Sequence, residues 1–179
     1  MSRHTRTLSA ALALAAVSAT PLLAQAPARQ PDFMVMTMEM GAKHIRSMFA
    51  IAADSMAEAD FAFKPTGDVR SFGQLLAHVA ASNYLFCSSA LGEKSPATDV
   101  EKTRTTRTDI RQVLTESMDY CDRAFASMHD ATKANTPRPF RQAQFPALAI
   151  LNFRNYHALL HWGNAITYVR LRGKVPPSA

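Results

Sequence analysis

Residues 71–91 read SFGQLLAHVAASNYLFCSSAL, and the spacing within them decides the fold class. Ser71 and Gln74 have the spacing of a capping box, in which the two side chains satisfy backbone amides of the first helical turn. We therefore predict a helix from Ser71 to about Leu91. At 100° per residue, His78 falls on the flank of its inward face. That face recurs at steps of three and four residues and comprises Phe72, Leu75, Leu76, Val79, Asn83, Phe86, Cys87 and Ala90.

Three further segments show the same helical spacing. They run from about Pro31 to Ala59, from Arg104 to Ala131 and from Ala147 to Arg172, where Gly173 and two prolines follow. The alternating methionines at 34–40 would also suit a short strand, but their segment continues at helical steps. Because each helix has a single apolar side, mutual burial in a four-helix bundle is the economical arrangement. We predict an all-α fold.

The connection between the second and third helices is long. It runs from Gly92 through Pro96 to Thr103, about twelve residues, whereas adjacent antiparallel helices are usually joined by fewer. Twelve extended residues can span the roughly 30 Å length of a twenty-residue helix. The second and third helices can therefore run parallel.

The first thirty residues have the layout of a secretory signal. Arg3 and Arg6 give a basic start, residues 8–17 are apolar, and no acidic residue precedes Asp32. The apolar run is about ten residues, whereas a membrane-spanning helix needs roughly twenty. We predict an exported, soluble, periplasmic protein rather than one held by an uncleaved membrane tether.

The signal peptide is assigned to residues 1–28. Ala26 completes a small-x-small cleavage site, but Pro27 would hinder cleavage there, so cleavage after Ala28 is the competing choice. Residues 29–179 then form one domain, because about 150 residues match one ordinary domain.

The charges of the mature chain are scattered. The whole chain has a formal net charge of +6, which falls to +4 without Arg3 and Arg6. The closest approach to a basic patch lies at residues 102–111, and Glu101, Asp109 and Glu116 interrupt it. Solvated helix faces explain this pattern, and we predict no nucleic-acid partner.

The two cysteines, Cys87 and Cys121, each lie in an apolar helical stripe. In an oxidising compartment an even cysteine count favours a disulfide. The closed loop of about thirty-five residues would contribute on the order of 3 to 4 kcal/mol. The alternative is two buried free thiols.

The histidines predict a metal site. His157 and His161 are four residues apart, which places both rings on one helix face with Cβ atoms roughly 6 Å apart. Zinc and nickel accept neutral imidazole nitrogens, and His78 is the candidate third ligand because a polar ring beside the core needs a partner. His44 and His129 have no such spacing and are predicted to be surface residues. The alternative for the cluster is a purely structural role.

Two segments resemble the DinB-like family. The start of its second helix is similar to FKPTGDVRSFGQLLAHV, residues 63–79, and its last helix to HALLHWGNAITYVRLRGKVPP, residues 157–177. The resemblance implies a bundle of up-down-down-up topology in which His78, His157 and His161 bind a divalent ion, zinc or nickel. Asn164 departs from the glutamine that commonly follows the glycine, and we expect no effect on metal binding.

The resemblance also indicates a reaction class. Three protein ligands leave one coordination position open, where a water or thiol loses its proton more easily. Characterised relatives include thiol-dependent S-transferases and maleylpyruvate isomerases, and many relatives form homodimers. We expect an exported metal-dependent transferase or hydrolase with a small-molecule substrate. The rival is a noncatalytic binding or stress-related bundle in which the ion joins two helices.

Two more residues share the histidine face of the last helix. Arg154 lies one turn before His157 and would suit an anionic substrate group, while Tyr168 lies beyond His161. Packing or surface roles are the alternative for both. No aspartate or glutamate has a position that assigns it as a general base.

Overall fold

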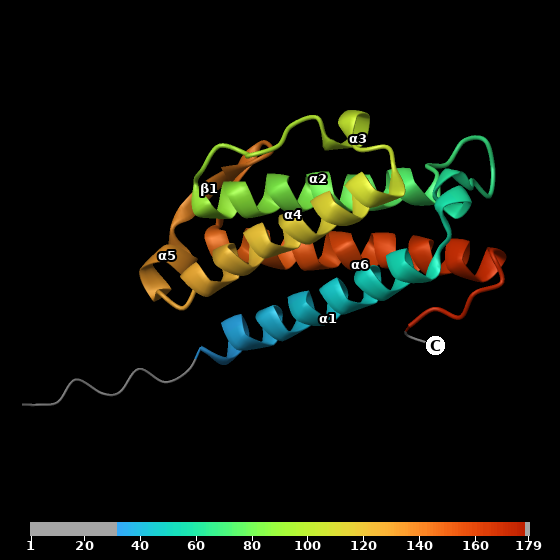
Figure 1. Ribbon diagram of the computed structural model, residues 1–179. Helices are drawn as coiled ribbons and strands as arrows, with labels where there is room; N and C mark the ends of the chain where they lie inside the picture. The colour runs from blue at the N-terminus through green and yellow to red at the C-terminus, as the bar shows by residue number, and fades with distance from the viewer. Residues whose placement is uncertain (1–31, 178–179) are drawn as a thin grey trace, which may run out of the picture. The chain divides into compact units, whose positions relative to one another are not determined.

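The structure, a computed structural model, describes residues 32–177. The predicted signal peptide and both of its cleavage positions lie outside the described residues. The described part is mostly helical with one small sheet (Figure 1). Its elements are α1 (Phe33–Ser55), a 3-10 helix (Glu58–Ala62), α2 (Phe72–Leu91), α3 (Val100–Thr103), α4 (Arg107–Ser127), α5 (Ala131–Asn135), β1 (Pro137–Phe140), β2 (Ala143–Pro146) and α6 (Ala147–Leu171).

Capping residues mark the start of α1, α2 and α4 and the end of α2. The Asp32 side chain accepts hydrogen bonds from two amides of the first turn of α1. Ser71 and Gln74 form the predicted capping box of α2, and Thr106 caps α4. Gly92 ends α2 with a φ of +73°, a left-handed conformation that glycine adopts without strain. The predicted predominance of helix is confirmed.

The connections contain structure that the sequence pattern did not predict. Two short helices, α3 and α5, and a hairpin of β1 and β2 lie between the long helices. The strands pair antiparallel from Pro137 with Pro146 to Phe140 with Ala143. Four-residue strands are too short to show a period of two, and proline is tolerated only at strand edges and ends. Our expectation of four helices and no strand was therefore too simple.

α2 lies beside α4, and the two run in the same direction. Near the middle of each helix, the Asn83 side chain donates to Ser117 at 3.0 Å, and one turn later Cys87 is bonded to Cys121. Sequence numbers thus rise together along both helices. The connection at residues 92–106 passes back along the pair, as Figure 1 shows.

α6 lies beside α2 in the opposite direction and beside α1 in the same direction. The Phe72 ring at the start of α2 packs near Tyr168 at the end of α6, with ring centroids 6.4 Å apart. Along α1, Asn155 donates to the Met38 carbonyl, and further on the Phe49 and Trp162 rings meet edge to face at 5.4 Å. Apolar faces of all four long helices contribute to the core.

A charged side chain is buried within this core. Arg154 is only 2% exposed, and its guanidinium donates to the side chains of Asn83 at 2.8 Å and Asn155 at 3.0 Å. Burial lowers the pKa of Arg154 to about 10, although the nearby carboxylate of Asp122 opposes this effect. Arg154 therefore stays charged at neutral pH and depends on these partners.

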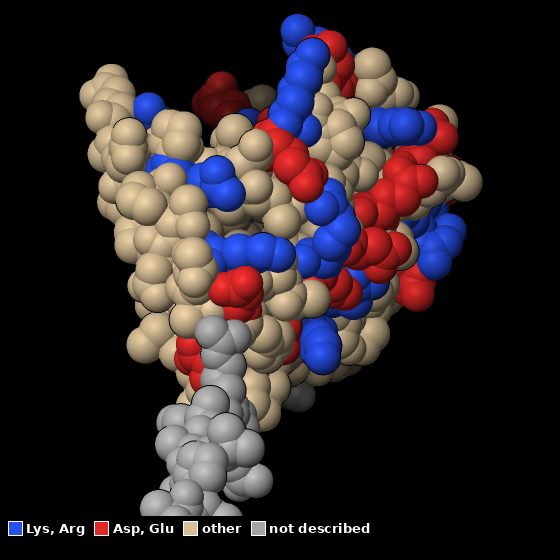
Figure 2. Space-filling view, turned by 90° about the vertical axis from the view of Figure 1, so that its left-hand side faces the viewer, with Lys and Arg blue, Asp and Glu red and all other residues tan. Residues whose placement is uncertain are grey.

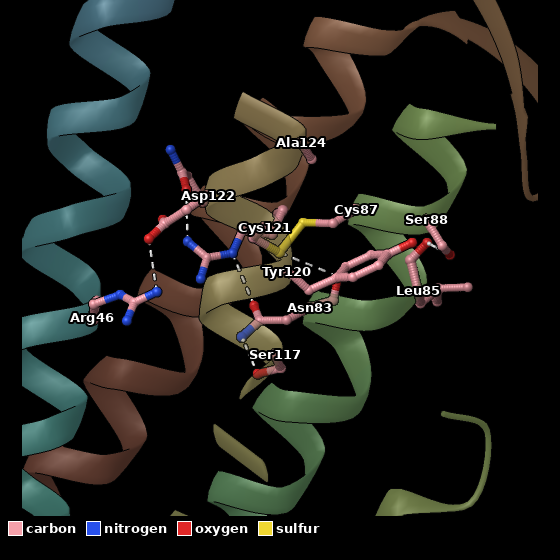
Figure 3. The surroundings of a disulfide bond; sticks show 12 residues. Arg46, Asn83, Leu85, Cys87, Ser88, Ser117, Tyr120, Cys121, Asp122 and Ala124 are labelled. Atoms are coloured by element: carbon pink, nitrogen blue, oxygen red, sulfur yellow. Dashed lines mark hydrogen bonds and ion pairs between the residues drawn. A yellow bond between two sulfur atoms is a disulfide. The ribbon is translucent and has the colours of Figure 1, made fainter. Parts of the chain in front are cut away.

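The disulfide joins α2 to α4 in the interior. Cys87 and Cys121 have Cα atoms 5.3 Å apart, and both residues are almost fully buried (Figure 3). Among residues 32–177 there is no free cysteine. The bond closes a loop that includes the whole connection between the two helices.

Charges on the outside are mixed. On the face in Figure 2, basic and acidic side chains lie next to one another over one side, and uncharged residues dominate the other. Within the described residues, no helix is long and apolar enough to cross a membrane.

Replacing both cysteines, Cys87→Ala with Cys121→Ala, is expected to lower the free energy of unfolding by about 3 to 4 kcal/mol. The reason is that the bond restricts the unfolded chain. Urea unfolding of the oxidised protein and of the variant measures the difference. Reductant should lower the midpoint of the wild type and leave that of the variant unchanged; a wild-type midpoint that ignores reductant contradicts the assignment.

Candidate metal centre

Three histidines meet where α2 and α6 pack together. His78 comes from α2, and His157 and His161 come from successive turns of α6. One ring nitrogen of each lies within 4.8 Å of the others, and all three side chains are half-buried. The neighbouring residues Ala77 and Ala158 are each 1% exposed. Both alanines belong to the same buried core cluster, beside which the three rings converge.

The histidines of α6 are suited to the neutral form that metal ligation requires. Burial lowers the pKa of His157 to about 4, and the positive charges of neighbouring side chains act in the same direction. Burial also lowers the pKa of His161. Both rings are therefore neutral at pH 7, and each has a nitrogen lone pair.

The spacing of the nitrogens fits a divalent ion. Nε2 of His157 and Nε2 of His161 are 3.3 Å apart. Two nitrogens that share one tetrahedral ion at about 2.0 to 2.1 Å lie about 3.3 Å from each other. The other nitrogen of that ring, Nδ1 of His161, is buried and has no hydrogen-bond partner among residues 32–177. A direct hydrogen bond between the two neutral rings is the alternative explanation of the short contact.

Glu101 orients the third histidine. Its carboxylate lies 2.8 Å from Nδ1 of His78, which leaves Nε2 of that ring for an ion. A carboxylate behind a ligating histidine fixes the ring and increases its basicity. Burial opposes ionisation of Glu101, but its contacts with His78 and Arg70 outweigh burial and lower the pKa of the carboxyl.

Sequence reasoning missed Glu101. It lies in α3, a four-residue helix inside the long connection, 23 residues after His78. No periodic signal places a loop residue of this kind. Only the return of the connection along α2 brings the carboxylate to the imidazole.

A cleft opens beside His161. Its volume is about 460 Å³, and the loop before α2 forms one wall while the last turns of α6 form the other. Arg70, Asn164 and Tyr168 line it. The Tyr168 hydroxyl donates to the Arg70 carbonyl at 2.7 Å, and burial raises the pKa of this tyrosine. Tyr168 thus anchors the loop that borders the cleft.

The structure separates the other predicted residues from the cluster. Arg154 is turned into the core toward Asn83 and Asn155, so its guanidinium is used within the protein. His44 and His129 are exposed, and His129 lies 3.2 Å from Glu39. Of the residues proposed to accompany the three histidines, only Tyr168 borders the adjoining cleft.

Solved structures with a similar fold exist. A DinB-like protein from Bacillus cereus superposes with a TM-score of 0.67 at 14% identity, covering 80% of this chain and 93% of that one. A DinB-like protein from Bacillus subtilis superposes with a TM-score of 0.60 at 21% identity, covering 76% and 94%. At these identities the likeness concerns the fold alone.

Comparison with family models agrees with the likeness in fold. Among curated proteins, none matches the chain. The model of the DinB superfamily matches residues 42–165, which is more than half of the sequence and includes all three clustered histidines. The chain belongs to the DinB superfamily.

Proposed function

We propose that this protein is an exported metal-dependent enzyme, a transferase or hydrolase, in which His78, His157 and His161 hold a zinc or nickel ion. The observation that carries the proposal is the convergence of three imidazole nitrogens within 4.8 Å of one another beside a cleft. A small-molecule substrate suits the volume of this cleft.

The ion would supply Lewis-acid chemistry, lowering the pKa of a water or thiol at its open position. The protein's own residues do the positioning. Glu101 holds the His78 ring through Nδ1, and Tyr168 fixes the loop that carries Arg70. The guanidinium of Arg70 also lies 3.4 Å from the Glu101 carboxylate. Arg70 therefore links the loop that lines the cleft to the residue that orients His78.

The proposal includes a finer description of the fold. We infer that α1, α2, α4 and α6 form a four-helix bundle of up-down-down-up topology. The directions of the helix pairs support this, because α2 runs with α4 and α6 runs with α1. The long connection after α2 provides the required crossover.

Export through a signal peptide at residues 1–28 is also proposed, with residues 29–179 as the mature domain. The buried disulfide supports it, because such bonds persist in oxidising compartments. Recovery from a periplasmic fraction of a chain that begins after Ala26 or Ala28 would agree with export, and a full-length cytoplasmic product would not.

The alternative is a noncatalytic bundle in which the ion fastens α2 to α6. The proposed ligands come from two different helices, and this arrangement supports the alternative as much as it supports an enzyme. Cobalt-substituted protein separates the two. An open position takes up azide or a thiol and changes the visible spectrum, whereas an ion closed to ligands gives an unchanged spectrum.

Metal content tests the common basis of both readings. The purified mature protein should contain about one equivalent of zinc or nickel by elemental analysis, and the double variant His157→Ala, His161→Ala should contain none. The matched control is His44→Ala with His129→Ala, which removes two exposed histidines and should retain the ion. Wild-type protein that neither contains a metal nor takes one up would refute the site.

The substitution Glu101→Gln is expected to weaken metal binding by about 10- to 100-fold, because a ligating histidine loses its orienting carboxylate. Competition with a chromophoric chelator measures the affinity. Glu116→Gln changes an exposed glutamate of α4 and should have no effect. An affinity equal to that of the wild type in Glu101→Gln would show that the carboxylate does not support the ligand.

A further inference from the structure

A second hollow lies at the end of α2. Its volume is about 700 Å³, and it is bordered by the last turns of α2, the loop after it and the start of the hairpin. The Phe86 ring lies 5.4 Å from that of His157 and stacks at 4.9 Å on Phe140, which lines the hollow. The hollow shares no lining residue with the cleft beside His161, so the two are separate.

Arg138 enters this hollow with an unsatisfied donor. Its Nε is buried and has no hydrogen-bond partner, and the side chain forms no ion pair within residues 32–177. A buried N–H of a charged group without an acceptor is costly, so a native structure that keeps one calls for a partner.

Gly92 makes the position of this guanidinium possible. A Cβ at residue 92 would overlap Nη1 and Cζ of Arg138. The φ of +73° at Gly92 also favours glycine over other residues. The cap of α2 thus leaves space that the Arg138 side chain occupies.

Arg141 supplies a second cation. It is exposed and lies in the two-residue turn between β1 and β2 with a φ of +55°, which is uncommon for a residue other than glycine. Its Cζ lies 5.8 Å from the centre of the Phe140 ring. Like Arg138, it has no carboxylate partner within the described part of the chain.

The acidic residue at the hollow does not neutralise these arginines. Glu93 accepts hydrogen bonds from both terminal nitrogens of Arg123, at 2.9 and 2.7 Å, and from the Tyr120 hydroxyl at 3.0 Å. Hydrogen bonding with Arg123 is the main reason that the pKa of Glu93 is lowered to about 2. Because Arg123 balances this carboxylate, no carboxylate among residues 32–177 compensates the charges of Arg138 and Arg141.

We propose that this hollow binds an oxyanion, the phosphate or carboxylate group of a small molecule. A guanidinium is a planar fork of donors that matches both groups. The volume lies within the range of small-molecule sites, roughly 300 to 1,000 Å³. Neither the donors nor the walls include a histidine of the cluster, so the site stands whether or not those histidines hold a metal.

Titration calorimetry with inorganic phosphate, and separately with acetate, tests the site at constant ionic strength set with chloride. Binding of either anion is expected, and the stronger one identifies the group that the hollow prefers. Arg138→Gln should weaken it about tenfold or more, because the variant removes both the charge and the fork of donors from the hollow. Arg141→Gln changes an exposed residue and should weaken binding without affecting the fold.

The matched control is Arg170→Gln, which removes an exposed arginine near the end of α6 and should bind the anion like the wild type. Protein treated with a chelator should also bind it unchanged. The proposal would be overturned if neither anion bound, or if both Arg138→Gln and Arg141→Gln bound the anion as well as the wild type. It would also be overturned if binding disappeared on removal of metal, because the anion would then lie at the histidines.

Discussion

The buried guanidinium of Arg154 is the constraint on which the arrangement of the helices depends. A charge taken out of water must be hydrogen-bonded, and Asn83 accepts from Arg154 while donating to Ser117. One amide therefore ties together α6, α2 and α4. Arg154 lies three residues before His157, and Asn83 lies five residues after His78. We infer that this network sets the axial register that brings the imidazoles together, because a slip of one turn, about 5.4 Å, would separate them.

Periodic features were predictable from the sequence, since a helix repeats its environment every three to four residues. The face of α2, its capping box and the pairing of His157 with His161 on one face all follow from local spacing. The assignment of His78 to the same cluster needed more, namely the argument that a polar ring beside the core requires a partner. The DinB resemblance rested on the same residues, and the family match includes them.

Features that have no repeating pattern in the sequence could not be predicted from it. Glu101 reaches His78 only because the connection folds back along α2, and the hairpin around Arg141 depends on four-residue strands. Arg154 shows the other limit. Its place on the histidine face of α6 suggested a substrate contact, but the side chain turns inward, where the asparagines of two helices satisfy it. Packing decides the direction in which a long, flexible side chain points. The position of a residue on a helix does not specify that packing.

The electrostatics of the two hollows differ in a way that bears on how ligands approach. Arg70, beside the cleft at His161, shares its charge with Glu101. Arg138 and Arg141, at the end of α2, have no carboxylate partner among residues 32–177, and the one acid at their hollow is balanced by its own arginine. Apart from any ion at the histidines, more uncompensated positive charge therefore lies at the end of α2 than at the cleft. An anionic molecule bound at that end would lie one aromatic side chain away from His157.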